Sequence, residues 1–265
     1  MNLLKVISGW WFGQQSKQAD QENDNYKIIK IKRKNKKARI LYVPNDELKE
    51  HLKSLLPDLQ EIYKNNVLVE CDHAFVQGKN CITHAMQHTK QRFVLKMDIE
   101  NFFHSIHTSH VAKYIPNIEP YALAFINDKL PQGFPTSPIL ANIAMIEIDY
   151  KIQQALNIDQ SKIFYTRYAD DLTFSFNDRS KEIYLIAVIS DILKQYKLRV
   201  NRKKTKLFDK HHGRATITGV GVSLDGIHPT RKIKKKLRAA KHQQNESSVK
   251  GLQEWIACKL PKAKE

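Results

Sequence analysis

The stretch from Phe164 to Phe176, FYTRYADDLTFSF, constrains this 265-residue chain more than any other. On both sides of Asp170 and Asp171, aromatic and β-branched residues alternate with polar ones, which is the period of a half-buried strand. Aspartates are disfavoured inside a strand and favoured in a turn. The pattern therefore predicts a β-hairpin with two carboxylates at its tip. Carboxylates this close repel each other unless a cation lies between them, and Mg²⁺ prefers oxygen ligands.

An acidic surface turn would explain Asp170 and Asp171 on their own, but a third carboxylate favours a metal site. Residues 93–99, FVLKMDI, read as an apolar strand with Asp98 near its end. A carboxylate at the end of a buried strand is costly unless it is paired or bound to a metal. We therefore expect Asp98 to complete the site that the hairpin begins.

The balance of charge indicates a polyanionic partner. The chain has 44 Lys and Arg against 27 Asp and Glu, a formal charge of +17, which exceeds what solubility requires. The basic residues do not gather on one amphipathic helix, so nucleic acid is favoured over a membrane surface. Apolar runs are too short to cross a bilayer, no signal peptide is found, and the three cysteines form no CxxC pair. We expect a cytoplasmic protein with no membrane partner.

The segments before the strand at 93–99 alternate between basic, helical and polar stretches. Residues 1–24 begin with an apolar, Trp-containing patch and continue as a polar stretch that resembles a linker. Residues 26–43 predict a hairpin, and Lys27 to Arg39 includes eight basic residues and no acidic one. Either this hairpin is simply solvated or it lies over phosphates, and the charge of one sign favours phosphates. We expect a helix over 46–63 that is interrupted at Pro57, and a loop from 73 that becomes a helix ending near residue 90.

The segment from Leu130 to Asn142, LPQGFPTSPILAN, contains three prolines and a glycine before a predicted helix that ends near Leu156. Ser137 is a candidate N-cap, and Pro138 suits the first turn. An ordinary rigid loop is the alternative. The segment lies between the two acidic segments in the sequence, and this position favours a substrate platform. Farther on we expect a helix over 181–196, a basic loop and strand over 198–208, a small hairpin made of 215–222 and the turn at 224–227, and a basic helix from about 230 to 241.

Taken in order, these segments resemble the motifs of reverse transcriptases, specifically the bacterial branch that includes the retron enzymes. The resemblance runs from Tyr26 to about Ile227 and rests on FVLKMDIENFF, LPQGFPTSPILAN, RYADD and VNRKKTKLF. It implies an α+β, right-hand polymerase fold with fingers, palm and a short thumb. The implied divisions are an N-terminal segment (1–24), fingers (25–92), palm (93–222, with a fingers insertion at about 108–130), and the primer-grip end with the thumb (223–265).

The resemblance also implies the site. Asp98, Asp170 and Asp171 would hold two Mg²⁺ ions, with Ile99 included in the metal site. The ring of Phe103 would exclude a ribose 2′-OH. The remaining candidates for dNTP binding are Gln132 and Gly133 in the nucleotide pocket, Lys204 as the lysine of its motif, and three cations for the triphosphate, Lys32, Arg39 and Lys79.

Two short motifs resemble retron signatures. NCITH, from Asn80 to His84, resembles NAxxH with Cys81 in place of Ala, and ITG, which begins at Ile217, resembles VTG with Ile in place of Val. Asn80 and His84 are four residues apart, so a helix would place both on one face, where they could bind a folded RNA. An ordinary buried histidine is the alternative for His84. In the basic helix, Arg231, Lys232 and Lys235 are candidates for contacts with RNA phosphates.

The resemblance implies an RNA-directed DNA polymerase that takes dNTPs and an RNA–DNA hybrid. A retron enzyme would use a structured noncoding RNA as template and as a 2′-OH primer, make a branched RNA–DNA, and act with an effector protein in phage defence. Two alternatives remain open. One is another bacterial reverse transcriptase, of the diversity-generating or abortive-infection type. The other is an RNA-binding scaffold with a relic site, which the intact Asp98, Phe103, Gln132, Asp170 and Asp171 argue against.

Overall fold

The computed structural model describes residues 17–23, 25–33, 36–158 and 162–257. By its internal contacts the chain forms two compact units. The first comprises Met1–Asn65 and Ile106–Ile143, and the second comprises Asn66–Ser105 and Ala144–Glu265. The division falls inside helix α7 (Ser137–Ile158). The boundaries of fingers, palm and thumb stay a prediction.

A three-stranded antiparallel sheet opens the first unit, in the order β1-β2-β3. Its strands are β1 (Lys17–Asn23), β2 (Tyr26–Arg33) and β3 (Lys36–Pro44). The predicted basic hairpin is therefore confirmed. The linker expected before it is wrong in part, because residues 17–23 form β1. This strand, KQADQEN, has no apolar alternation, and it is a strand because its backbone pairs with the free edge of β2.

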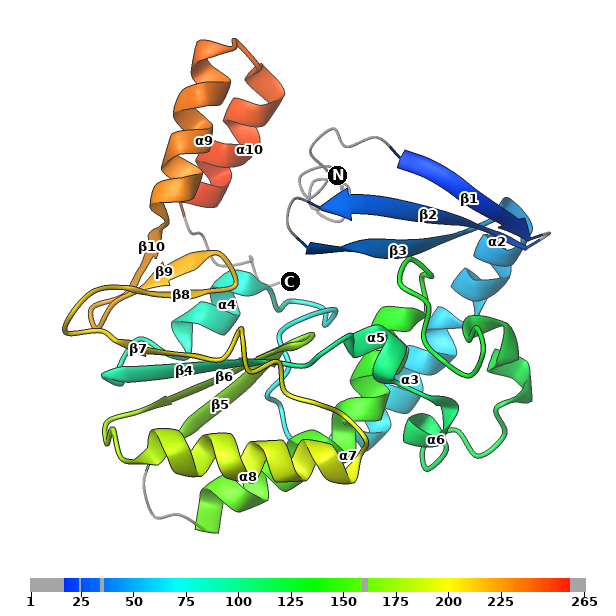
Figure 1. Cartoon of the computed structure of the whole chain (residues 1–265), viewed down its shortest axis with the longest axis horizontal. Coiled ribbons are helices and arrows are strands. Elements are labelled where there is room, and N and C mark those ends of the chain that lie inside the picture. The colour runs from blue at the N-terminus through cyan, green and yellow to red at the C-terminus, as the bar shows by residue number, and fades with distance from the viewer. Residues whose placement is uncertain (1–16, 24, 34–35, 159–161, 258–265) are drawn as a thin grey trace. The chain divides into compact units, whose positions relative to one another are not determined.

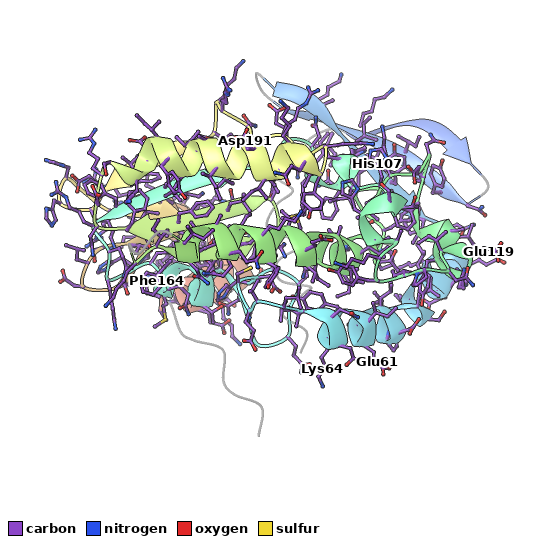
Figure 2. All side chains as sticks on the ribbon, turned by 90° about the horizontal axis from the view of Figure 1, so that it is seen from below. Glu61, Lys64, His107, Glu119, Phe164 and Asp191 are labelled. Atoms are coloured by element: carbon purple, nitrogen blue, oxygen red, sulfur yellow. The ribbon has the colours of Figure 1, made fainter. Side chains whose placement is uncertain are left out.

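Helices α2 (Asp46–Ser54) and α3 (Leu56–Asn66) follow β3, and the expected interruption just before Pro57 is confirmed. The side chain of Asn45 accepts a hydrogen bond from the backbone N–H of Leu48 at 2.8 Å and caps α2. Glu61 and Lys64 lie on the outer face of α3 (Figure 2). The unit also includes α6 (Thr108–Val111) and the 3₁₀ turn η1 (Glu119–Ala124).

The proline-rich loop before α7 is bonded to β3. The backbone N–H of Tyr42 donates to the carbonyl of Gln132 at 2.8 Å. Gly133 has φ +123°, and a Cβ there would lie 2.2 Å from the carbonyl oxygen of Tyr42, so no other residue fits this approach. The N-cap expected at Ser137 is wrong. Ser137 is the first helical residue and its hydroxyl donates to the carbonyl of Pro131, whereas the carbonyl of Thr136 accepts from Leu140 and so occupies the cap position.

The second unit is built on a four-stranded antiparallel sheet in the order β5-β6-β4-β7. Helix α8 (Lys181–Gln195) and the later part of α7 cover one face of this sheet, and α4 (Cys81–Met86) lies on the other (Figure 1). Asp191 lies on the outer side of α8 (Figure 2). The strands are β4 (Phe93–Asp98), β5 (Phe164–Tyr168), β6 (Asp171–Phe176) and β7 (Lys206–Asp209).

Helix α4 is shorter than expected, since it ends at Met86 rather than near Lys90. The chain continues in tighter turns, in which the N–H of His88 donates to the carbonyl of Ala85. The ammonium of Lys210 donates hydrogen bonds to the carbonyls of His88 and Thr89 at 2.6 and 2.7 Å. A side chain that is 122 residues away therefore satisfies the carbonyls that a longer helix would have used.

A second small sheet packs against α4. It consists of β8 (Ala215–Ile217), β9 (Val220–Val222) and β10 (Ile227–Pro229), so the predicted hairpin is confirmed and gains a third strand. Helices α9 (Arg231–His242) and α10 (Glu246–Ile256) follow, with Thr230 as the N-cap of α9. The short helix α5 (Phe102–Ser105) follows β4. Within the described part of the chain, no helix has both the length and the apolar character needed to cross a membrane.

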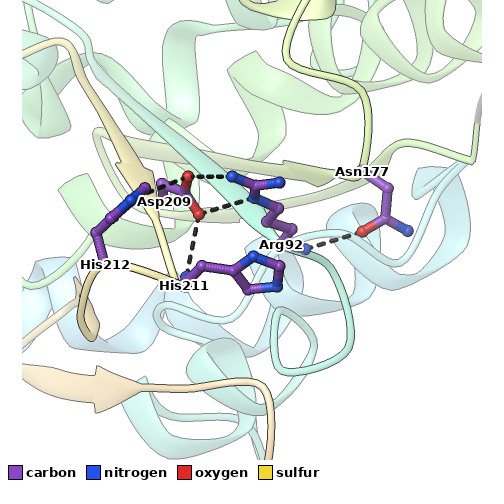
Figure 3. Close-up of polar contacts among 5 residues, drawn as sticks. All are labelled: Arg92, Asn177, Asp209, His211 and His212. Carbon is purple, nitrogen blue, oxygen red and sulfur yellow. Dashed lines mark hydrogen bonds and ion pairs between the residues drawn. The ribbon is translucent and has the colours of Figure 1, made fainter.

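An ion pair and a hydrogen bond join the ends of β4, β7 and β6 at one end of the four-stranded sheet (Figure 3). The guanidinium of Arg92, just before β4, donates to both carboxylate oxygens of Asp209 at the end of β7, at 3.0 and 2.7 Å. The backbone N–H of Arg92 donates to the side chain of Asn177, which follows β6, at 2.9 Å. This arrangement holds the end of the sheet opposite Asp98.

Candidate active site

The predicted hairpin is present, with Asp170 in its turn and Asp171 as the first residue of β6. Ala169 has φ +55°, which gives the turn its tight reversal. In the pairing of β4 with β6, Asp98 lies directly opposite Asp171. The backbone N–H of Ile99 donates to the carbonyl of Asp170 at 3.0 Å. The three aspartates thus lie at the adjoining ends of β4 and β6.

Burial and mutual repulsion decide the charge of these carboxylates. The pKa of Asp170 is raised to about 6, first by burial and then by Asp171 and Asp98. Burial also raises the pKa of Asp171, while Lys96, whose ammonium lies 3.7 Å from its carboxylate, opposes this rise. Lys204 lies 2.8 and 2.6 Å from the two oxygens of Asp98. The site therefore has a deficit of positive charge around Asp170.

The donor set fits a divalent cation in kind. Carboxylate oxygens are what Mg²⁺ prefers, and a cation would relieve the repulsion that raises the pKa of Asp170. Among the residues that the structure describes, no three His, Cys, Asp or Glu side chains converge as a ready metal cluster. The ammonium of Lys204 instead neutralises Asp98. Asp98, Asp170 and Asp171 are the residues that would hold the metal, and the part of Ile99 in metal binding stays a prediction.

The loop that includes Lys204 is docked on the end of β4. The N–H of Asn201 donates to the carbonyl of Asp98 at 2.7 Å, and the N–H of Glu100 donates to the carbonyl of Arg199 at 2.8 Å. The ammonium of Lys204 therefore reaches Asp98 because its loop is fixed beside that strand. The sequence predicted that Lys204 contacts the nucleotide. The structure adds an ion pair between Lys204 and Asp98.

Phe103 lies in α5, directly after the strand of Asp98, and its ring is half-buried. The rings of Phe102 and Phe75 lie near it, with centroids 5.5 and 6.5 Å away. Phe75 has φ +64° and is half exposed, and sequence reasoning did not single it out. A non-glycine residue with a positive φ is uncommon, and the sequence around Phe75 does not reveal this backbone conformation.

The other predicted nucleotide contacts divide between the units. Gln132 and Gly133 meet Tyr42 on β3, the strand that includes Arg39, and Lys32 is exposed on β2. All of these belong to the first unit, and their roles in dNTP binding stay predictions.

Lys79 is placed in the second unit, but not beside the carboxylates. It lines a shallow pocket together with Phe164 and Thr166, which lie in the half of β5 farthest from Asp170, and its ammonium lies 3.8 Å from Glu70. Lys79 was expected to contact the triphosphate away from the metals, and that contact stays a prediction.

Asn80 and His84 belong to the same helical turn, and the structure shows the buried histidine that was the alternative for His84. Asn80 is the N-cap of α4, and its side chain accepts from the backbone N–H of Ile82 at 2.8 Å and of Thr83 at 3.0 Å. His84 is fully buried, and burial holds its pKa well below the ordinary value. Its ring stacks on Tyr168, with centroids 5.7 Å apart. Any contact of this pair with RNA stays a prediction.

The two retron-like motifs meet in the structure. Nδ1 of His84 lies 3.3 Å from the hydroxyl of Thr218 in the turn between β8 and β9, and that hydroxyl donates to the carbonyl of Cys81 at 3.4 Å. Two more buried histidines flank His84, with ring centroids 5.6 Å away for His73 and 5.8 Å for His88. Sequence reasoning missed this contact because Thr218 is 134 residues away from His84 in the chain. Of the predicted RNA contacts on α9, Arg231, Lys232 and Lys235 are all exposed.

The fold is that of polymerases. The chain resembles apo telomerase from Candida tropicalis with a TM-score of 0.56 at 14% identity, over 81% of this chain and 57% of that one. It resembles a foamy viral protease–reverse transcriptase bound to double-stranded DNA with a TM-score of 0.52 at 18% identity, over 89% of this chain and 36% of that one. These likenesses confirm the expected α+β fold.

Residues 31–245 match the family described as reverse transcriptase (RNA-dependent DNA polymerase), and the chain belongs to that family. It is 30% identical to the retron Ec73 reverse transcriptase of Escherichia coli over 78% of this chain and 72% of that protein. It is 28% identical to the retron Ec86 enzyme of the same species over 88% and 75% of the two chains, and 28% identical to the retron Mx65 enzyme of Myxococcus xanthus over 84% and 57%. The protein is a reverse transcriptase of the retron type.

Proposed function

We propose that the chain synthesises DNA on a structured noncoding RNA and primes from a 2′-OH within that RNA, so that the product is a branched RNA–DNA. The observation that carries the proposal is the meeting of Asp98, Asp170 and Asp171 at adjoining strand ends, in a chain of the reverse transcriptase family. The retron relatives support the choice of template and primer.

In this proposal each part of the chain has one task. Asp98, Asp170 and Asp171 would hold two Mg²⁺ ions, which when bound would supply charge stabilisation for the attacking and leaving oxygens. Lys204 compensates the charge of Asp98 at 2.6 Å and keeps that carboxylate oriented. Phe103 limits the space at the sugar of the incoming dNTP. Residues 25–92 act as fingers, 93–222 as palm, and 223–265 as primer-grip end and thumb, and the exposed cations of α9 contact duplex phosphates.

The partners follow from the same proposal. They are dNTPs, the noncoding RNA, its RNA–DNA hybrid, and an effector protein in a phage-defence role. DNA synthesis takes place in the cytoplasm, and no membrane takes part.

The test uses purified protein, Mg²⁺, dNTPs and RNA transcribed from the same locus. We expect labelled DNA that stays attached to RNA after denaturation and is released by an enzyme that cleaves 2′,5′ linkages. Extension of a supplied DNA primer on a plain RNA template tests polymerase activity alone. Activity in the second assay without branched product in the first would limit the function to general reverse transcription. Loss of both would overturn the proposal.

A further inference from the structure

A pocket with a volume of about 240 Å³ lies at the start of β5. It is lined by Glu70, His73, Lys79, Gln87 and Phe164, together with the next two residues of the strand. All of them belong to the second unit. The sites of small-molecule ligands commonly measure about 300–1,000 Å³, so this pocket suits one flat ring system rather than a larger ligand.

An exposed aromatic ring forms the rim of this pocket. Phe164 is 44% exposed, whereas its neighbours Ile163 and Tyr165 are buried. Figure 2 labels Phe164 on the ribbon. No other aromatic ring of the described residues stacks on that of Phe164. An unpaired ring of this kind is what RNA-binding proteins offer to a single unstacked base.

The polar groups of the pocket divide into satisfied and open ones. The hydroxyl of Thr166 bonds to Nε2 of His88 at 2.7 Å, and Nδ1 of His73 bonds to the hydroxyl of Thr83 at 2.9 Å. Burial lowers the pKa of His73 to about 4, so that ring is neutral in a neutral solution. Gln87 is exposed, and the carboxylate of Glu70, which is 87% exposed, lies 3.8 Å from the ammonium of Lys79. Lys79 supplies the positive charge.

We propose that this pocket binds one unpaired nucleobase, which stacks on Phe164. Glu70 and Gln87 meet donors and acceptors on the edge of the base, and Lys79 meets the adjoining phosphate. Its place at the far end of β5 from Asp170 separates it from the polymerase site. The inference rests on the proposed function, because the natural source of the base is the RNA partner. A free nucleotide offers the same chemistry.

The experiment measures binding at this pocket while the polymerase site is filled. Full-length protein is first saturated with an RNA–DNA primer–template duplex, and then a fluorescent eight-nucleotide oligocytidylate is added and followed by anisotropy. We expect Phe164→Ala to weaken binding about tenfold, in line with the contribution of one stacked base. Phe164→Tyr, which keeps the ring, should bind within about twofold of the unchanged protein. An oligomer of abasic residues should bind the unchanged protein as weakly as oligocytidylate binds Phe164→Ala.

Ile183→Ala is the matched control, since Ile183 is 79% exposed on α8 and does not line the pocket. Oligocytidylate binding that is unchanged by Phe164→Ala, or that Ile183→Ala weakens equally, would overturn the inference. Unlabelled cytidine monophosphate and unlabelled oligocytidylate are then compared as competitors. If both displace the probe at equal concentrations, the pocket is assigned to free nucleotides. If the oligomer displaces it at a lower concentration, the pocket is assigned to RNA. Primer extension should be normal in Phe164→Ala. If the unchanged protein shows no primer extension, that result counts against the proposed function instead.

Discussion

At the scale of single residues, burial and two neighbouring carboxylates oppose the charge of Asp170. Asp170→Asn should reduce primer extension by more than about a hundredfold, since even the loss of an outer partner of a metal site often costs 10- to 100-fold. The midpoint of thermal unfolding should stay the same or rise, because an amide removes the repulsion that holds the pKa near 6. Extension in Mg²⁺ and a melting curve measure the two effects. Near-normal extension would contradict the assignment of Asp170 as a metal ligand.

Phe103 acts through its bulk, and its neighbours allow a specific test. Phe103→Ala removes the ring that follows the strand of Asp98 and should increase the incorporation of ribonucleotides relative to deoxyribonucleotides. Single-nucleotide extension with each substrate measures this ratio. Phe102→Leu is the control, because Phe102 is buried beside it and a change there should alter stability without altering the ratio. If Phe103→Ala lowers both rates equally, Phe103 is a packing residue.

At the scale of elements, the histidines in and around α4 predict acid sensitivity. Burial lowers the pKa of His73 to about 4 and of His88 to about 3, and that of His84 in the same direction. Between about pH 6.5 and 4 the unfolded chain binds protons that the folded chain does not. The free energy of unfolding should therefore fall as the pH falls through this window, with a slope of up to about 1.4 kcal/mol per pH unit for each histidine.

Urea unfolding at several pH values measures this slope. The raised pKa of Asp170 acts with the opposite sign between about pH 4 and 6, so the measurement is cleanest in Asp170→Asn. His88→Gln should remove about one histidine's share of the slope, although it also lowers stability because the ring bonds to Ser175 and Thr166. A stability that does not change between pH 6.5 and 4 would mean that these histidines titrate normally.

Helix α9 supplies the second prediction at this scale. Replacing Lys232, Lys235 and Lys236 with Gln should weaken duplex binding without changing its base preference, because phosphate contacts do not read sequence. The slope of log affinity against log salt should flatten by roughly 0.7–0.9 for each phosphate that the protein no longer neutralises. Titrations at several salt concentrations measure it, with Lys194→Gln on α8 as the control. An unchanged slope would mean that these lysines only face solvent.

At the scale of the whole molecule, contacts between distant segments hold the catalytic sheet in shape. The Arg92–Asp209 pair spans 117 residues, and its hydrogen bonds lower the pKa of Asp209 well below the ordinary value. Asp209→Asn should lower the midpoint of urea unfolding and leave kcat nearly unchanged, because the pair lies at the end of the sheet opposite Asp98. The stability that the pair contributes should be present at neutral pH and be lost as the pH falls below about 4. Equal midpoints for the two proteins would mean that the pair contributes nothing.

Local signals in the sequence were enough to determine most elements and the carboxylate site. The hairpin at 164–176 follows from period-two alternation around an Asp pair, and the interruption between α2 and α3 follows from Pro57, since both depend on neighbours along the chain. Asp98 was found because a carboxylate at the end of a buried strand needs a partner.

Only the tertiary structure decided features that depend on segments distant in sequence. β1 is a strand because β2 offers it an edge, and beyond the early end of α4 the ammonium of Lys210 donates to the carbonyls of His88 and Thr89. His84 is buried against Tyr168 and Thr218, which no spacing within Asn80–His84 reveals. Periodicity reports which face of an element is apolar, but the partner that covers a polar group comes from packing, where burial and hydrogen bonding outweigh local preference.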